Sequence, residues 1–265
     1  MLATAVIPSE VEGSRDATFK ITPRDSSTSL GMTNKFFTAL DVYHDIPSRS
    51  AAMNMAIDEA LFESANAPSI RFYRWDHRAI SFGYFGNFAD VAEHNCDLVR
   101  RWTGGGIVFH GNDLTYSIVI PSSDSAFAES SMSIYEKIHR ALRDALIATD
   151  EPAELSAVAA VYDRRHPRRS AVIDRRYRKD CFANPVRADV LINGRKVAGA
   201  AQRRTRRGLL QQGSIHVDFE NGLTARFAQA LSANCNECKI EIDVLDRACK
   251  LVEQKYGTDA WFRKR

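Results

Sequence analysis

Three consecutive glycines form the part of this chain best suited to holding a ligand. They are Gly104, Gly105 and Gly106, and they separate two segments, 98–102 and 107–110, that have the composition of strands. Glycine lacks a Cβ, so its backbone can adopt positive φ and bring N–H groups close to a phosphate, a carboxylate or a thioester carbonyl. Arg100 and Arg101 add positive charge beside this turn. The structural alternative is a tight hairpin that joins the two segments.

Lys196 and Cys181 are the side chains best suited to group transfer. Lys196 lies in the run Asn-Gly-Arg-Lys-Val-Ala-Gly-Ala-Ala-Gln, which reads as a strand with small neighbours. Its charge could stabilise an oxygen that becomes negative, although a solvated lysine on a strand face is the alternative. Cys181 lies upstream, in Asp-Cys-Phe-Ala-Asn-Pro. A thiolate becomes an adequate nucleophile once neighbouring cations lower its pKa, whereas most lone cysteines are inert.

The glycine run and the lysine segment together resemble the lipoate-protein ligase A and octanoyltransferase family, relatives of biotin protein ligase. In that family the first segment carries Arg-Arg-x-x-Gly-Gly-Gly-x-Val-x-His, and the second carries Gly-[Arg/Lys]-Lys-[Val/Ile]-x-Gly-x-Ala. Both patterns occur here in the same order, and the resemblance runs from about residue 51 to the C-terminal helix. It implies a biotin/lipoate protein ligase catalytic domain, which is similar to class II synthetases.

The resemblance also implies roles for individual residues. The family's lysine, here Lys196, points into the ligand tunnel and bonds the acyl carboxylate, its adenylate or the thioester carbonyl. Cysteine-dependent octanoyltransferases have a Cys-Phe at the place of Cys181, and ATP-dependent ligases generally lack it. These transferases take octanoyl onto the cysteine from acyl carrier protein and pass it to a lysine. The implied acyl-binding residues are Arg100, Arg101, Gly104, Gly105, Gly106, His110, Gly199 and Ala200.

The resemblance therefore implies transfer of octanoyl, or lipoyl, through a Cys181 thioester without any cofactor. The implied partners are octanoyl acyl carrier protein and the lipoyl domains of 2-oxoacid dehydrogenases or the glycine cleavage H protein. One alternative is an ATP-dependent lipoate-protein ligase, which uses ATP and Mg and forms lipoyl-adenylate. An amidotransferase between two lipoyl proteins and a non-catalytic acyl sensor are the others. The chain ends soon after the catalytic domain, whereas two-domain ligases add a C-terminal domain, and this favours the transferase.

Composition narrows the class of protein further. The net charge of +3 is too small to argue for nucleic-acid binding, and no apolar window is long enough for a membrane span. Five scattered cysteines disfavour a disulfide framework and suit a reducing cytoplasm. The single Cys-x-x-Cys at 235–238 lacks the second pair that zinc usually requires, so no metal site is expected. Eight of the sixteen residues in 164–179 are Arg or Lys, and they form either a solvated loop or a surface that steers an acidic carrier.

Patterning predicts a disordered extension over 1–32, with Met32 as an alternative start, followed by a single catalytic domain over 33–265. Regular structure is expected to begin at Ser48, whose neighbour Ser50 is a second candidate for the cap of the first helix. Mixed strands with helices outside them indicate an α+β fold. Helices are predicted at 51–65, 88–95, 133–148, 224–232 and 240–256. Strands are predicted at 70–75, 79–82, 98–102, 107–110, 114–120, 188–192, 196–202 and 208–217.

Overall fold

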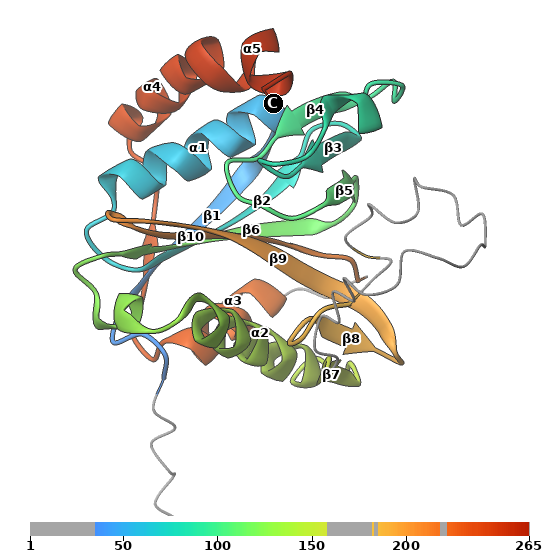
Figure 1. Cartoon of the computed structure of the whole chain (residues 1–265). Helices are drawn as coiled ribbons and strands as arrows, with labels where there is room; N and C mark the ends of the chain where they lie inside the picture. Colours follow the sequence, from blue (N-terminus) through green and yellow to red (C-terminus); the bar gives the residue numbers. More distant parts are fainter. Residues whose placement is uncertain (1–34, 158–181, 183–184, 218–221, 265) are drawn as a thin grey trace, which may run out of the picture. The chain divides into compact units, whose positions relative to one another are not determined.

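The computed structural model describes residues 35–157, 182, 185–217 and 222–264. The predictions for the N-terminal extension, for the basic run 164–179 and for Cys181 lie outside these residues. The described chain is α+β, with two mixed β-sheets and helices against their faces, as the patterning predicted (Figure 1).

The larger sheet has eight strands in the order β11-β1-β2-β6-β10-β9-β8-β7. The pairs β11–β1 and β1–β2 are parallel, and the remaining pairs are antiparallel. The strands are β1 (Leu40–Arg49), β2 (Ser69–Trp75), β6 (Leu114–Pro121), β7 (Ala153–Leu155), β8 (Val190–Ile192), β9 (Arg195–Thr205), β10 (Gly208–Ile215) and β11 (Cys235–Cys238).

The smaller sheet positions the glycine run. Its strands are β3 (Ala79–Phe82), β4 (Asp97–Arg100) and β5 (Ile107–His110), in the order β4-β3-β5. Because β3 lies between the two segments that flank the glycines, these segments do not form the hairpin considered above. The glycine turn instead crosses from one edge of the small sheet to the other.

Helices cover both faces of the large sheet (Figure 1). On one face lie α1 (Ala51–Ser64) and α4 (Ile242–Leu251), and on the other lie α2 (Ser131–Ile147) and α3 (Leu223–Leu231). Ser50 caps α1, because its Oγ accepts from the Met53 amide at 3.4 Å. The predicted helix over 88–95 is reduced to one short turn, Phe88–Asp90. The C-terminal helix widens into a π-helical turn, Val252–Tyr256, before α5 (Asp259–Phe262).

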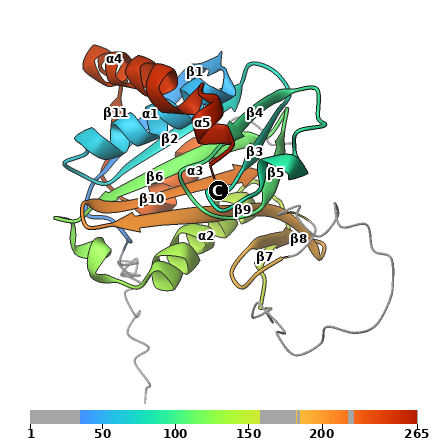
Figure 2. The same cartoon turned by 45° about the horizontal axis from the view of Figure 1, so that its top comes forward.

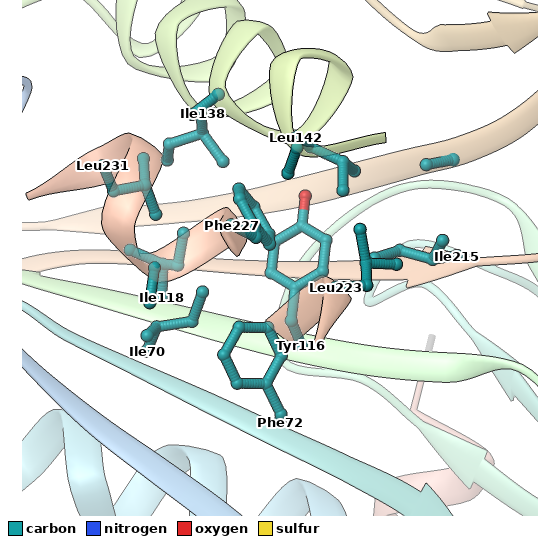
Figure 3. Packing of buried hydrophobic residues seen from close by; sticks show 14 of the residues in the cluster. Ile70, Phe72, Tyr116, Ile118, Ile138, Leu142, Ile215, Leu223, Phe227 and Leu231 are labelled. Carbon is teal, nitrogen blue, oxygen red and sulfur yellow. The ribbon is translucent and has the colours of Figure 1, made fainter. Parts of the chain in front are cut away.

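The core beneath α2 and α3 is the largest hydrophobic cluster of the described residues (Figure 3). Tyr116 on β6 lies edge-on to Phe227 of α3, with ring centroids 5.3 Å apart. Aliphatic side chains from α2, α3 and the sheet surround them. The aliphatic side chains labelled in this view are Ile70, Ile118, Ile138, Leu142, Ile215, Leu223 and Leu231.

The expectation that regular structure begins at Ser48 was wrong. Strand β1 starts eight residues earlier, at Leu40, and pairs with β2 and β11 inside the large sheet. Among its apolar side chains only Leu40 and Val42 are buried, and Ile46 in the later half of the strand is exposed. The strand pairs with segments far away in the sequence, so local patterning gave little sign of it.

His139 on α2 should make stability depend on pH. It is fully buried, its Nδ1 donates to the Ala188 carbonyl at 2.7 Å, and its Nε2 accepts from Tyr116 Oη at 3.0 Å. Burial lowers the pKa of His139 from 6.5 to about 4. The unfolded chain therefore binds more protons between these values, so this contribution is complete above pH 6.5 and is lost as the pH falls through 4.

We expect His139→Gln, which bonds without titrating, to flatten the decline in unfolding free energy over that pH range by roughly 3 kcal/mol. Urea unfolding at several pH values measures this difference. Equal slopes for the two proteins would show that His139 titrates normally.

Candidate active site

A pocket in the described part of the chain lies between the small sheet and strands β2, β6, β9 and β10 of the large sheet. It is partly open to solvent and is lined by sixteen residues. Its walls are mostly aromatic, aliphatic or glycine, with a few polar groups among them. The polar groups are Ser81, Arg101, His110, Thr115, Lys196, Gln212 and Ser214.

The lysine predicted from the sequence lines this pocket on β9. Lys196 is 8% exposed, and its Nζ lies 2.8 Å from Oδ2 of Asp189, which is fully buried. The other carboxylate oxygen of Asp189 accepts from Tyr135 Oη at 2.5 Å, and Oδ2 also accepts from the Val186 amide at 2.7 Å. This arrangement fixes an ammonium group in the wall of the pocket. It is not the solvated face residue that was the alternative.

Gly199 leaves the space that the lysine side chain occupies. A Cβ at this position would lie 2.5 Å from Lys196 Cε and 2.6 Å from its Nζ. Gly199 and its neighbour Ala200 both line the pocket, and the Ala200 amide donates to Tyr135 Oη at 3.1 Å. The absence of a side chain at Gly199 therefore makes room for the lysine side chain.

We expect Gly199→Ala to displace the ammonium group while leaving most of the fold in place, because the end of a lysine side chain moves more easily than backbone. The rate of the acyl transfer that the resemblance implies should fall by roughly 10- to 100-fold. Ala198→Gly on the same strand is the control for strand propensity. Unchanged turnover in Gly199→Ala would show that the lysine position is unimportant.

Arg101 connects the glycine turn to the pocket. Its Nη2 donates to the carbonyls of Gly104 at 3.1 Å and Gly106 at 2.7 Å, and its Nη1 donates to Ser81 Oγ at 2.6 Å. Gly105 has φ of 85°, as expected of a turn that needs glycine. The three glycines are not themselves part of the pocket lining, whereas Arg101 is.

Arg100 points away from the pocket. Its five N–H donors all bond backbone carbonyls, at 2.6 to 3.0 Å. Three of these carbonyls belong to the C-terminal segment, where α5 lies beside β4 in both views (Figures 1 and 2). The acceptors are Tyr84, Gly86, Trp261, Phe262 and Lys264. Arg100 therefore holds the C-terminal segment against the small sheet and is not part of the pocket lining.

His110 lines the pocket at the end of β5. Its ring stacks on Trp75, with centroids 3.9 Å apart. Its two nitrogens lie 2.8 Å from Asp113 Oδ2 and 2.6 Å from Ser81 Oγ. Burial lowers its pKa, against the opposing effect of Asp113, so the imidazole is neutral at physiological pH.

Phe182 is the described residue next to the predicted nucleophile in the sequence, and it also lines the pocket. Its ring centroid lies 4.1 Å from that of His216, and Lys196 Nζ lies 5.3 Å from its ring centroid. The structure thus brings together five of the sequence elements singled out above, which are Arg101, His110, Lys196, Gly199 and Ala200, and adds Phe182 to them.

The model of the lipoyl protein ligase A/B catalytic domain matches residues 50–255. The chain belongs to this family. Relatives named octanoyltransferase LipM share 37% identity in Clostridioides difficile (strain 630), over 65% of this chain and 64% of that protein, and 34% in Bacillus subtilis (strain 168), over 66% and 65%. The chain spans about 60 to 65% of the length of the curated relatives it matches.

Solved structures share the family's fold. A putative lipoate protein ligase from T. acidophilum with bound lipoic acid has a TM-score of 0.63 and 22% identity, and the match covers 86% of this chain and 99% of that one. A lipoate-protein ligase A bound with ATP also has a TM-score of 0.63, with 21% identity, covering 86% and 98%. The predicted catalytic-domain fold is therefore confirmed. No helix in the described ranges is both long and apolar enough to span a membrane.

Several polar residues in and around the pocket had no predicted role. Gln212 joins the pocket floor to the core, because its Nε2 donates to Asp58 Oδ2 at 2.7 Å and its Oε1 accepts from Thr103 Oγ1 at 2.7 Å. Asp189 and Ser81 are polar residues inside apolar strand patterns, at 0% and 1% exposure. A buried polar residue needs a partner, and that requirement is the one signal that marked them in the sequence.

Proposed function

We propose that this protein is an acyltransferase of protein lipoylation that moves octanoyl, or lipoyl, from acyl carrier protein to a lysine of a lipoyl domain. The reaction passes through a thioester on Cys181. The observation that carries the proposal is the buried Lys196–Asp189 pair in a largely apolar pocket, with Phe182, the residue after Cys181, packed beside it. The relatives named octanoyltransferase support the same reaction.

The pocket suits both halves of such a transfer. Apolar walls can take up an octanoyl chain, and they exclude water that would hydrolyse a thioester. In the first half, the Cys181 thiolate attacks the donor thioester carbonyl, the acyl–sulfur bond to the carrier breaks, and the carrier leaves as a thiolate, which then takes up a proton from solvent. In the second half, the acceptor amine attacks and frees Cys181. Lys196 stabilises the negative charge that grows on the acyl oxygen in both halves.

The balance of this reaction needs no ATP, because the donor thioester is already activated. The roles of the glycine turn, through Arg101, and of His110, Gly199 and Ala200 are those of acyl-binding residues in this proposal. The proposed partners are octanoyl acyl carrier protein as donor and, as acceptors, lipoyl domains of 2-oxoacid dehydrogenases or the glycine cleavage H protein.

The test is transfer of octanoyl from its carrier protein to a purified lipoyl domain, with and without ATP. We expect acceptor modification at the same rate in both mixtures, followed by intact mass of the acceptor. Modification that requires ATP, Mg and free lipoate or octanoate would instead identify a ligase. Transfer from one lipoyl protein to another but not from carrier protein would identify an amidotransferase.

The basic run 164–179 gives a second prediction about the donor. If it steers an acidic carrier, replacing Arg168, Arg169, Arg175 and Arg176 by Ser should raise the KM for carrier protein several-fold, with the wild-type kcat/KM falling as salt screens the interaction. A small octanoyl thioester has no acidic surface and should react equally with both proteins. Equal losses with both donors would mean that the run shapes the site instead.

A further inference from the structure

Asp113, which follows β5, is a buried carboxylate that accepts hydrogen bonds from four groups. Its Oδ1 accepts from the Gly111 amide at 2.8 Å, and its Oδ2 accepts from Ser214 Oγ at 2.6 Å and Thr115 Oγ1 at 3.1 Å. Its Oδ2 also lies 2.8 Å from His110 Nδ1. Asp113 is 5% exposed, and burial alone would raise its pKa, but the bonds from these donors hold it well below the usual range. This group is therefore an acceptor only.

An acceptor at Asp113 determines the tautomer of His110. The Nδ1 atom must carry the hydrogen that is donated to the carboxylate, and a neutral imidazole then has a free lone pair on Nε2. Stacking on Trp75 holds the ring plane. The Nε2 atom faces Ser81 Oγ at 2.6 Å, so the serine hydroxyl donates to it.

The Ser81 hydroxyl therefore acts both as a donor and as an acceptor. Its only hydrogen is used by His110, which leaves its oxygen lone pairs to accept from Arg101 Nη1 at 2.6 Å. Arg101 in turn holds the carbonyls of Gly104 and Gly106. From Arg101 to Asp113, each hydrogen bond is therefore donated toward the carboxylate, and Arg101 also donates to the glycine turn.

We propose that a positioning relay fixes the guanidinium of Arg101 on the pocket wall. The relay consists of Asp113, His110 and Ser81, in this order. It contributes to acyl transfer by keeping the charge of Arg101 and the carbonyls of the glycine turn in one geometry, because electrostatic stabilisation depends on groups that need no rearrangement during the reaction. This deepens the proposed function and rests on it wherever activity is the readout.

The relay predicts the tautomer of His110, and this prediction can be tested without measuring activity. Nitrogen-15 NMR of the histidine rings, assigned by comparison with His110→Gln, should show a neutral imidazole protonated on Nδ1. Asp113→Asn would present an amide N–H₂ to this nitrogen and should move the hydrogen to Nε2, which then can no longer accept from Ser81. A ring of the wild type protonated on Nε2, or on both nitrogens, at neutral pH would overturn the relay.

A second test measures activity after removal of one of two buried serine hydroxyls. Ser81→Ala breaks the relay, whereas Ser117→Ala removes a serine on β6 that donates to Asp58 at 2.7 Å outside the pocket lining. We expect similar small losses of melting temperature in both variants, but a roughly 10- to 100-fold lower kcat with unchanged KM in Ser81→Ala alone. Asp113→Asn should lower kcat at least as much.

Losses of activity that follow melting temperature equally in Ser81→Ala and Ser117→Ala would reduce the relay to ordinary packing and overturn the proposal. An octanoyl ester recovered on Ser81 would also overturn it, because the serine would then be an acyl acceptor. If the wild type shows no transfer without ATP, the proposed function fails, and the tautomer of His110 still tests the relay.

Discussion

Replacing Lys196 by Met should lower the rate of octanoyl transfer by roughly 100- to 1,000-fold, because one preorganised charge at the acyl oxygen is lost from a site that excludes water. The KM values should change little if the lysine acts mainly in the transition state. Turnover with carrier protein and lipoyl domain measures the effect. Lys137→Met is the control, since that lysine on α2 makes a solvent-exposed ion pair with Glu129 and does not line the pocket.

The ion pair of Lys196 adds a complication that the sequence did not reveal. Lys196→Met alone leaves the carboxylate of Asp189 buried without its cation, and breaking such a pair destabilises a protein by roughly 3 kcal/mol. The double variant Lys196→Met/Asp189→Asn removes both charges and should recover much of the melting temperature without recovering activity. Full turnover in either variant would remove Lys196 from the reaction, and recovery of activity together with stability would make its role structural.

Cys181→Ala should abolish transfer from carrier protein to lipoyl domain, because in the proposed reaction no other group on the enzyme holds the acyl group. Cys249→Ala is the matched control, since Cys249 is an exposed free thiol on α4. It should retain wild-type turnover. Transfer that persists in Cys181→Ala would favour direct attack of the acceptor lysine on the donor, with no covalent intermediate on the enzyme.

The sequence predicted the lysine side of the pocket better than the arginine side. Lys196, Gly199 and Ala200 lie on one strand, so their spacing in the sequence determines their relative positions. The structure brings all three to the pocket. The two arginines were treated as equivalent, yet Arg100 is the last residue of β4 and Arg101 lies just beyond the strand. Arg101 therefore meets the pocket while Arg100 binds the C-terminal segment.

Partners of buried polar residues could not be predicted. Ser81 bonds His110 across two paired strands, and Asp189 bonds Tyr135 of α2, which is 54 residues away. Such contacts depend on the strand order of two sheets, and the order β4-β3-β5 is not readable from local composition. The helices were predicted more accurately, because caps such as Ser50 and the periodicity of apolar residues act within one element.

The most direct test of the proposed reaction is the intact mass of the wild-type protein after brief incubation with octanoyl carrier protein, without ATP and without acceptor. We predict that the protein gains the mass of one octanoyl group, that peptide mapping places it on Cys181, and that hydroxylamine removes it as expected of a thioester. Adding a lipoyl domain should transfer the group to the acceptor lysine. A protein that stays unmodified in this mixture, yet lipoylates the acceptor when ATP and free lipoate are supplied, would contradict the transferase and identify a ligase.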